Sequence, residues 1–337
     1  MLVTRVDAIN TRWFIVSIIT IASLFFVSCS SCNATCVQLN KKQLSQLYKR
    51  YTVTSCSKLV SKWKSLEYLD LTNLQLDNIN FLREFTHLRA LDLSFNQLTS
   101  IKPLLAYSHL QTLILTGNKL SSISGIQSLK KLQILELSDN HLTDLSPLSA
   151  LSELQELSFS NNEVSNIDFL NNLNVRLLVF ESNRVSNIDV LRNASSLRIL
   201  NISKNPIHSL HAIKNLSDLK ELFAISSGIK KLGNLTSLVN LRRAYLSDNK
   251  LLDVVGLCAK NSRLKELLVP HNQISNLRGL EKCHSINILD ISDNPVNSVQ
   301  TLEKLKKLKT LIAFGTKITH RSQLQKVPSL KTIVLTK

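Results

Sequence analysis

The sequence predicts an α/β protein built as a right-handed solenoid, with a curved parallel sheet on the concave face and 3₁₀ or extended turns on the convex face. Three observations lead to this fold class. The chain has 337 residues, of which 64 are Leu and 30 are Asn. Leu and Asn recur at a fixed period from position 66 to the end, the signature of stacked repeats. Only 7 Gly and 6 Pro are present, which excludes collagen-like and flexible low-complexity chains.

The repeat follows the pattern Leu-x-x-Leu-x-Leu-x-x-Asn-x-Leu, and the segment 132–151 shows it clearly. Twelve complete units and one partial unit occupy residues 66–337. Their spacing is 22 residues, except for one of 21 (154 to 175) and one of 23 (241 to 264). The units begin at Leu66, Leu88, Leu110, Leu132, Leu154, Val175, Leu197, Leu219, Leu241, Leu264, Ile286, Leu308 and Leu330.

Each unit combines a short strand with a return path. Leu135 and Leu137 alternate with polar or variable residues, as a strand with one buried face requires. Leu142, Leu145 and Leu148 follow at a spacing of three, which suits 3₁₀ or extended turns better than a long α-helix. Because one unit cannot bury its apolar side alone, we expect neighbouring units to share a continuous core.

Asn occupies the ninth position in nine of the twelve complete units. We expect its amide to point inward and to satisfy backbone groups that leave the strand without ladder partners. Leu74, Ser227 and Thr316 break the pattern, and the two hydroxyl residues predict local irregularity in their turns. The predicted ladder consists of Asn96, Asn118, Asn140, Asn162, Asn183, Asn205, Asn249, Asn272 and Asn294.

This pattern resembles the leucine-rich repeat family, and more narrowly its 22-residue class found in bacterial internalins and in a eukaryotic phosphatase regulator. The resemblance covers residues 66–337. The internalin-like class implies a non-enzymatic scaffold that binds a protein or another macromolecule through its concave face. The phosphatase-regulator resemblance implies an alternative, a regulatory subunit that binds and controls an enzyme such as a phosphatase.

The N-terminus has the pattern of an export signal, which disfavours that intracellular alternative. Arg5 and Arg12 precede an uncharged stretch of 15 residues (13–27), shorter than the roughly 20 needed to span a bilayer. We interpret residues 1–34 as a signal peptide or a lipoprotein signal, cleaved between 28 and 29 or between 34 and 35. The segment Phe26-Val-Ser-Cys29 resembles a bacterial lipoprotein signal, with Cys29 as the lipidation site, although Phe26 stands where Leu is usual.

Cleavage after Ala34 would leave Cys36 and Cys56 as a candidate disulfide, closing a loop of roughly 20 residues worth about 3 kcal/mol. Residues 37–65 lie outside the repeat and predict an N-terminal helical cap on the first coil. Its apolar residues are Leu39, Leu44, Leu47, Tyr48, Tyr51, Leu59, Val60 and Trp63. No comparable cap follows the last unit, and the sequence leaves open whether that strand pairs with a partner.

The sequence contains no Gly-rich phosphate loop, no His-Glu-x-x-His and no Gly-x-Ser-x-Gly. His208 and His211 are the closest histidine pair, and no third ligand accompanies them. We therefore expect no catalytic residue, no metal, no cofactor and no enzymatic activity. Cys258 and Cys283, in the return halves of neighbouring units, are expected to be buried thiols that act as small hydrophobes.

The third, fifth and seventh positions of each unit are expected to point out from the concave face. At the fifth position, acids occupy several units and are interpreted as solvated residues: Asp70, Asp92, Glu136 and Asp290. Three consecutive units instead carry apolar residues there, with an apolar neighbour and charges beside them. The predicted ligand-binding patch consists of Phe223, Tyr245, Leu268, Ile225, Glu221, Arg243 and Glu266, and its exposed aromatics are typical of a binding hot spot. Alternatively, these side chains only pack on one another across the strands.

The second positions form a basic edge: Arg89, Arg176, Arg198, Lys220, Arg242, Lys265, Lys309 and Lys331. The net charge is +17, which favours anionic partners. This edge can contact an anionic surface or form a solvated stripe. The lack of interleaved aromatics disfavours nucleic acid. The predicted localisation is exported, either membrane-anchored through the N-terminus or its lipid, or secreted. The ligand's identity, the organism class and the oligomeric state stay open.

Overall fold

The computed structural model of the chain describes residues 32–259, 262–318, 321–327 and 329–336. The predicted signal segment lies outside the described residues except for positions 32–34, and so does the candidate lipidation site Cys29. Within the described part, no helix is both long enough and apolar enough to cross a membrane.

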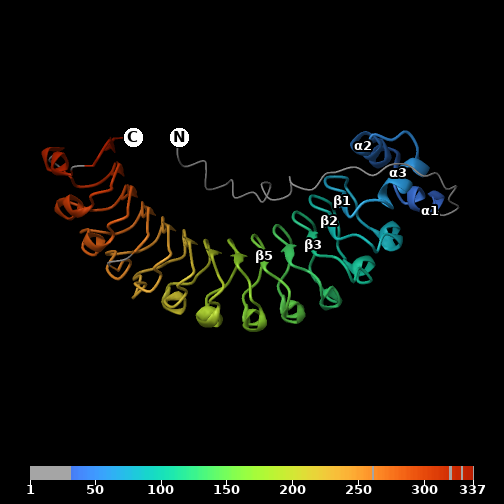
Figure 1. Ribbon diagram of the computed structural model, residues 1–337, viewed down its shortest axis with the longest axis horizontal. Helices are drawn as coiled ribbons and strands as arrows, with labels where there is room; N and C mark the ends of the chain where they lie inside the picture. The colour runs from blue at the N-terminus through green and yellow to red at the C-terminus, as the bar shows by residue number, and fades with distance from the viewer. Residues whose placement is uncertain (1–31, 260–261, 319–320, 328, 337) are drawn as a thin grey trace.

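Thirteen short parallel strands, one per unit, form a single open sheet in sequential order. They line the inner side of the arc in Figure 1. Each pair is in register, so that equivalent positions of neighbouring units lie side by side, as Leu135 does with Leu157. The strands are β1 (Tyr68–Asp70), β2 (Ala90–Asp92), β3 (Thr112–Ile114), β4 (Ile134–Glu136), β5 (Glu156–Ser158), β6 (Leu177–Val179), β7 (Ile199–Asn201), β8 (Glu221–Phe223), β9 (Arg243–Tyr245), β10 (Glu266–Leu268), β11 (Ile288–Asp290), β12 (Thr310–Ile312) and β13 (Thr332–Val334).

Most return paths contain a 3₁₀ turn on the outer side of the arc (Figure 1). These turns are η3 (Asn80–Glu84), η4 (Lys102–Leu104), η5 (Ile126–Ser128), η6 (Ser146–Ala150), η7 (Asp168–Asn172), η8 (Asp189–Asn193), η9 (His211–Ile213), η10 (Leu280–Lys282), η11 (Gln300–Lys304) and η12 (Arg321–Lys326). The apolar residues at spacing three point inward: Leu142, Leu145 and Leu148 are all buried. Sheet and turns therefore enclose one core that runs along the solenoid, the leucine-rich repeat architecture expected from the sequence.

The ninth-position asparagines are buried and connect successive coils. The amide nitrogen of Asn140 donates to the carbonyl oxygens of Leu115 and Leu137, each at 3.0 Å, while its Oδ1 accepts from the backbone N–H of Leu120 at 3.0 Å. The other eight asparagines make equivalent bonds. Each side chain thus satisfies backbone groups of two neighbouring units that the strands leave unpaired.

Ser227 shows why the ladder becomes irregular at one exception. Its hydroxyl donates to the carbonyl oxygen of Ile202 at 3.2 Å, as an Asn amide would. The shorter side chain does not take the N–H of Ile207, which bonds to the backbone oxygen of Asn205 at 2.8 Å. The next residues form an isolated bridge between Ser209 and Lys231. One missing amide therefore changes the local backbone pairing.

Three helices cover the first coil: α1 (Cys32–Val37), α2 (Lys41–Tyr51) and α3 (Cys56–Trp63). Asn40 caps α2 through its Oδ1, which accepts from the N–H of Gln43 at 2.9 Å. A disulfide joins Cys36 to Cys56 with the Cα atoms 6.2 Å apart. Trp63 is fully buried against Phe85, with ring centroids 5.6 Å apart. The helices therefore close the N-terminal end of the core.

Helix α2 also satisfies backbone groups of the first strand. The hydroxyl of Tyr51 donates to the carbonyl oxygen of Asp70 at 2.8 Å and accepts from the N–H of Asp70 at 2.9 Å. Arg50 forms an ion pair with the Asp70 carboxylate at 3.0 Å and donates to the carbonyl of Thr72 at 2.9 Å. β1 is an edge strand of the described sheet, and these bonds pair backbone groups of Asp70 and Thr72 there, which protects the edge.

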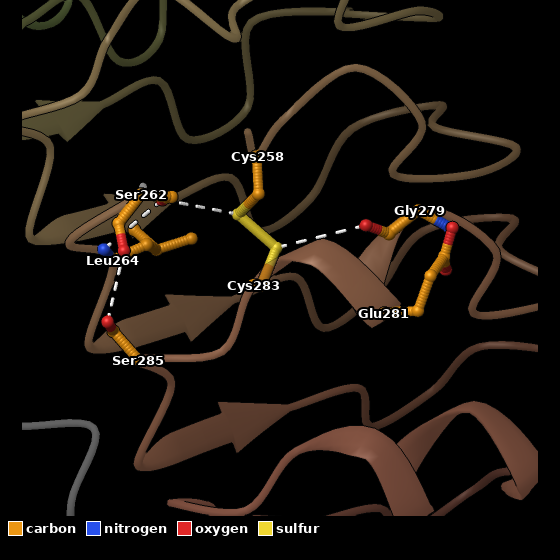
Figure 2. Close-up of a disulfide and its surroundings, with 7 residues drawn as sticks. All are labelled: Cys258, Ser262, Leu264, Gly279, Glu281, Cys283 and Ser285. Carbon is orange, nitrogen blue, oxygen red and sulfur yellow. Dashed lines mark hydrogen bonds between the residues drawn. A yellow bond between two sulfur atoms is a disulfide. The ribbon is translucent and has the colours of Figure 1, made fainter. Parts of the chain in front are cut away.

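The prediction of two free thiols in the ninth and tenth units was wrong. Cys258 and Cys283 form a second disulfide, with the Cα atoms 5.3 Å apart and both residues buried (Figure 2). Coil stacking brings equivalent parts of adjacent return paths to this separation, within the range that a disulfide spans. The bridge fastens the 23-residue unit, the longest in the solenoid, to the unit that follows it.

Candidate functional site

Three adjacent strands bring the predicted ligand-binding patch together on the concave face. In β8, β9 and β10 the third positions Glu221, Arg243 and Glu266 lie side by side in register. The fifth positions Phe223, Tyr245 and Leu268 form a parallel row next to them. The central residues Leu222, Ala244 and Leu267 face the core, so the alternation of the strands directs both rows away from it.

The charged row is an ion-pair triad centred on Arg243. Its Nη1 lies 2.5 Å from Oε1 of Glu221, and its Nε lies 3.4 Å from Oε2 of Glu266. Burial lowers the pKa of the guanidinium, but the carboxylates of Glu221 and Glu266 outweigh this effect, so that the pKa is raised above its ordinary value. The Arg243 side chain is half exposed, so the triad presents a fixed donor to solvent rather than a buried charge.

The aromatic row is less accessible than the sequence suggested. The rings of Phe223 and Tyr245 meet edge to face with centroids 4.8 Å apart. Phe223 is only 3% exposed, so the expectation that its ring is open to solvent was wrong. Tyr245, Leu268 and Ile225 are partly exposed. Burial raises the pKa of the Tyr245 hydroxyl, and the neighbouring Glu266 raises it further. Phe223 therefore supports the patch from beneath, while Tyr245 and Leu268 form its accessible apolar surface.

The N-terminal half of the concave face contains a buried acid that was expected to be solvated. Glu136 on β4 is only 6% exposed. Burial raises its pKa to about 7, with a lowering contribution from its hydrogen bond to Ser158 and raising contributions from Glu156 and Asp92. Asp92 and Asp290 are half buried, and burial raises the pKa of each carboxyl. The sequence does not show this burial, because it depends on neighbours on adjacent strands such as Ser158.

Phe95 is an exposed aromatic that sequence reasoning missed. It follows β2, is 61% exposed and has a φ of 57°. The eighth position of other units adopts the same left-handed conformation with residues such as Asp139, Asn161 or Gly117. A bulky aromatic is uncommon in this conformation, so its departure from the small or polar eighth residues was a usable signal. Its ring lies over Gly117, where a Cβ atom would come within 2.7 Å of the Phe95 Cδ1 atom.

The basic edge lies before the strands, at the opposite end from Phe95. Arg89 forms an ion pair with Glu67 at 3.4 Å. No ion pair to a described residue involves the other seven members of this edge. Among the residues that the structure describes, no group of three His, Cys, Asp or Glu side chains could hold a metal ion.

The fold and the repeat define the protein class. A leucine rich repeat family model matches residues 86–142, and a model of two leucine-rich repeat copies matches residues 130–172. The chain therefore contains leucine-rich repeats and has an internalin-like solenoid fold. No curated protein has a sequence that matches this chain.

Solved structures share this architecture at low sequence identity. An internalin (InlF) from Listeria monocytogenes is 23% identical, with a TM-score of 0.81 over 90% of this chain and 91% of that one. A leucine-rich repeat protein from Leptospira interrogans is 22% identical, with a TM-score of 0.68 over 84% and 81%. The ectodomain of a plant membrane receptor kinase from Arabidopsis thaliana, solved in complex with Casparian Strip Integrity Factor 2, is 18% identical, with a TM-score of 0.61 over 83% and 39%.

Proposed function

We propose that the protein is an exported, non-enzymatic scaffold that binds a protein ligand through the concave face at β8–β10. The observation that carries the proposal is the patch itself. Tyr245, Leu268 and Arg243 project from three adjacent strands, and Phe223 and two glutamates hold them in place. Preorganised aromatic and arginine side chains are the residues that most often dominate binding energy at protein interfaces.

The two disulfides support export. Such bonds form and persist in oxidising compartments and are rare in the cytosol. The basic, apolar N-terminal segment fits the same route, with either lipidation at Cys29 and membrane anchoring or cleavage and secretion. Disulfides also count against an intracellular regulatory subunit that controls a phosphatase. The similar fold of an internalin and of a receptor ectodomain agrees with a cell-surface scaffold.

A second contact complements the concave face in this proposal. The basic edge lies just before the strands, and seven of its eight members have no carboxylate partner among described residues. Unpaired cations in a row attract anionic surfaces. The edge would therefore hold the scaffold near anionic material while the concave face binds a protein.

The direct test is site-specific photo-crosslinking on cell-surface material. A benzophenone amino acid at Tyr245 should cross-link to a discrete protein, and excess unlabelled wild type should suppress the product. The same probe at Lys102, exposed on the convex face, is the matched control. Equal cross-linking from both positions, or no competition by wild type, would contradict binding at β8–β10.

A further inference from the structure

The C-terminal half of the basic edge is a row of positive charge with one interruption. In the eight units that contain β6 to β13, the second position is basic in seven. The exception is Asn287. We call these residues the basic row: Arg176, Arg198, Lys220, Arg242, Lys265, Lys309 and Lys331. Because neighbouring strands lie about 4.8 Å apart, the row is on the order of 35 Å long.

The backbone fixes the spacing of this row. The N–H of Lys331 donates to the carbonyl of Lys309 at 2.9 Å, and the N–H of Lys309 donates to the carbonyl of Asn287 at 2.9 Å. The same bond joins Asn287 to Lys265 at 2.8 Å. The backbone hydrogen bonds therefore fix the positions from which these side chains project. No carboxylate in the described part of the chain forms an ion pair with them.

A cavity of about 510 Å³ opens at the C-terminal end of the basic row. Five of the residues that line it are lysines, and none of its described lining residues is acidic; the lysines are Lys265, Lys306, Lys307, Lys309 and Lys331. Hydrogen bonds from two serines hold its walls: Ser329 Oγ donates to the Leu308 carbonyl at 2.9 Å, and Ser285 Oγ donates to the Ser262 carbonyl at 3.0 Å. Figure 2 shows Ser285 and Ser262 beside the Cys258–Cys283 disulfide, which fastens this part of the wall.

We propose that the basic row and its cavity bind a linear sulfated polysaccharide, with a sulfate group in the cavity among the lysines. The proposal rests on the anionic contact proposed above and names its ligand class and its site. A regular single file of cations fits a chain with regularly spaced anions. The ammonium groups of lysine act as point charges that contact such anions without a fixed fork geometry.

Other anionic partners fit this surface less well. Single-stranded nucleic acid uses aromatic side chains for base stacking, and no member of the basic row is aromatic. A protein partner would use an apolar anchor at its centre, whereas Leu330 is the only large apolar residue among the described residues of the cavity wall. A flat lipid surface could touch the row but could not enter the cavity.

The test measures binding of a fluorescent heparin decasaccharide to the purified protein by polarisation at several salt concentrations. The edge variant is Lys265→Gln with Lys309→Gln and Lys331→Gln. The control variant is Lys119→Gln with Lys250→Gln and Lys317→Gln, which removes the same charge from exposed tenth positions beyond the other end of the strands. Thermal unfolding verifies that all three proteins are folded.

We expect the edge variant to lose about tenfold or more in affinity and to show a shallower salt dependence, because fewer counterions are released. The control variant should bind like the wild type. The proposal is overturned if wild type does not bind, if both variants lose affinity equally, or if single-stranded DNA or anionic phosphatidylserine vesicles bind as tightly. A double variant of the ligand patch, Arg243→Ser with Leu268→Ser, should keep heparin binding but fail to compete with cross-linking from position 245. Heparin binding and protein binding can therefore be lost separately.

Discussion

Phe223 and Tyr245 lie on neighbouring strands with their rings edge to face and the centroids 4.8 Å apart, yet solvent reaches only the tyrosine to an appreciable extent. This arrangement separates two roles within one patch. Phe223 stabilises the sheet surface, and Tyr245 presents a ring and a hydroxyl to a ligand. A variant of Phe223 should therefore mainly lower stability, whereas a variant of Tyr245 should mainly weaken ligand binding.

Phe223→Ala should destabilise the protein by about 3 kcal/mol, since it removes a buried ring from a packed environment. Tyr245→Ala should cost clearly less because its ring is partly solvated. Urea unfolding of both variants measures the difference. If Phe223→Ala unfolds like the wild type, the ring is not packed as described.

Asn140→Ala should destabilise by about 1–3 kcal/mol because it leaves buried backbone groups of two coils without partners. Asn297→Ala, at an exposed position in another return path, is the control and should change little. A free energy of unfolding for Asn140→Ala that matches the control would show that the amide does not carry these bonds.

Glu136 should make stability depend on pH. Its pKa is about 7 in the folded state against 4.5 for an unperturbed group, so the folded state retains the proton that the unfolded state releases between these values. Stability should therefore fall as pH rises from 4.5 to 7, by on the order of 3 kcal/mol for this group. Glu136→Gln should match wild type near pH 4.5 and exceed it at pH 8.

The measurement is the free energy of unfolding in urea across that pH range. Glu84→Gln removes an exposed carboxyl and should follow the wild-type curve. Parallel curves for wild type and Glu136→Gln would show that Glu136 is ionised in the folded protein at the same pH as in the unfolded chain.

Cys258→Ala with Cys283→Ala should lower stability by about 3 kcal/mol, the value expected for a bridge across 25 residues. Thiol labelling under denaturing conditions, without reductant, should find neither cysteine free in protein from an oxidising compartment. Labelling of both residues in such protein would contradict the bridge and would restore the free thiols first expected there.

The repeat period predicted most of the fold because every unit buries the same positions against its neighbours. Leu135, Leu145 and Asn140 each face the core for a reason visible in the spacing of the sequence. The roles of Tyr51 and Arg50 were not visible, since their bonds to β1 depend on where the cap helices settle. The burial of Glu136 and Phe223 was not visible either, because it depends on neighbours on other strands, such as Ser158 beside Glu136 and Tyr245 beside Phe223. The residues of the ligand patch could be found from their shared repeat position, but their accessibility could not.

Competitive photo-crosslinking from Tyr245 tests the central claim, binding of a protein ligand at β8–β10, most directly. The account predicts one discrete protein adduct from position 245, suppressed by excess wild type but not by excess protein carrying Arg243→Ser with Leu268→Ser. Suppression by that double variant as strong as by wild type, or the same adduct from a probe at Lys102, would contradict it.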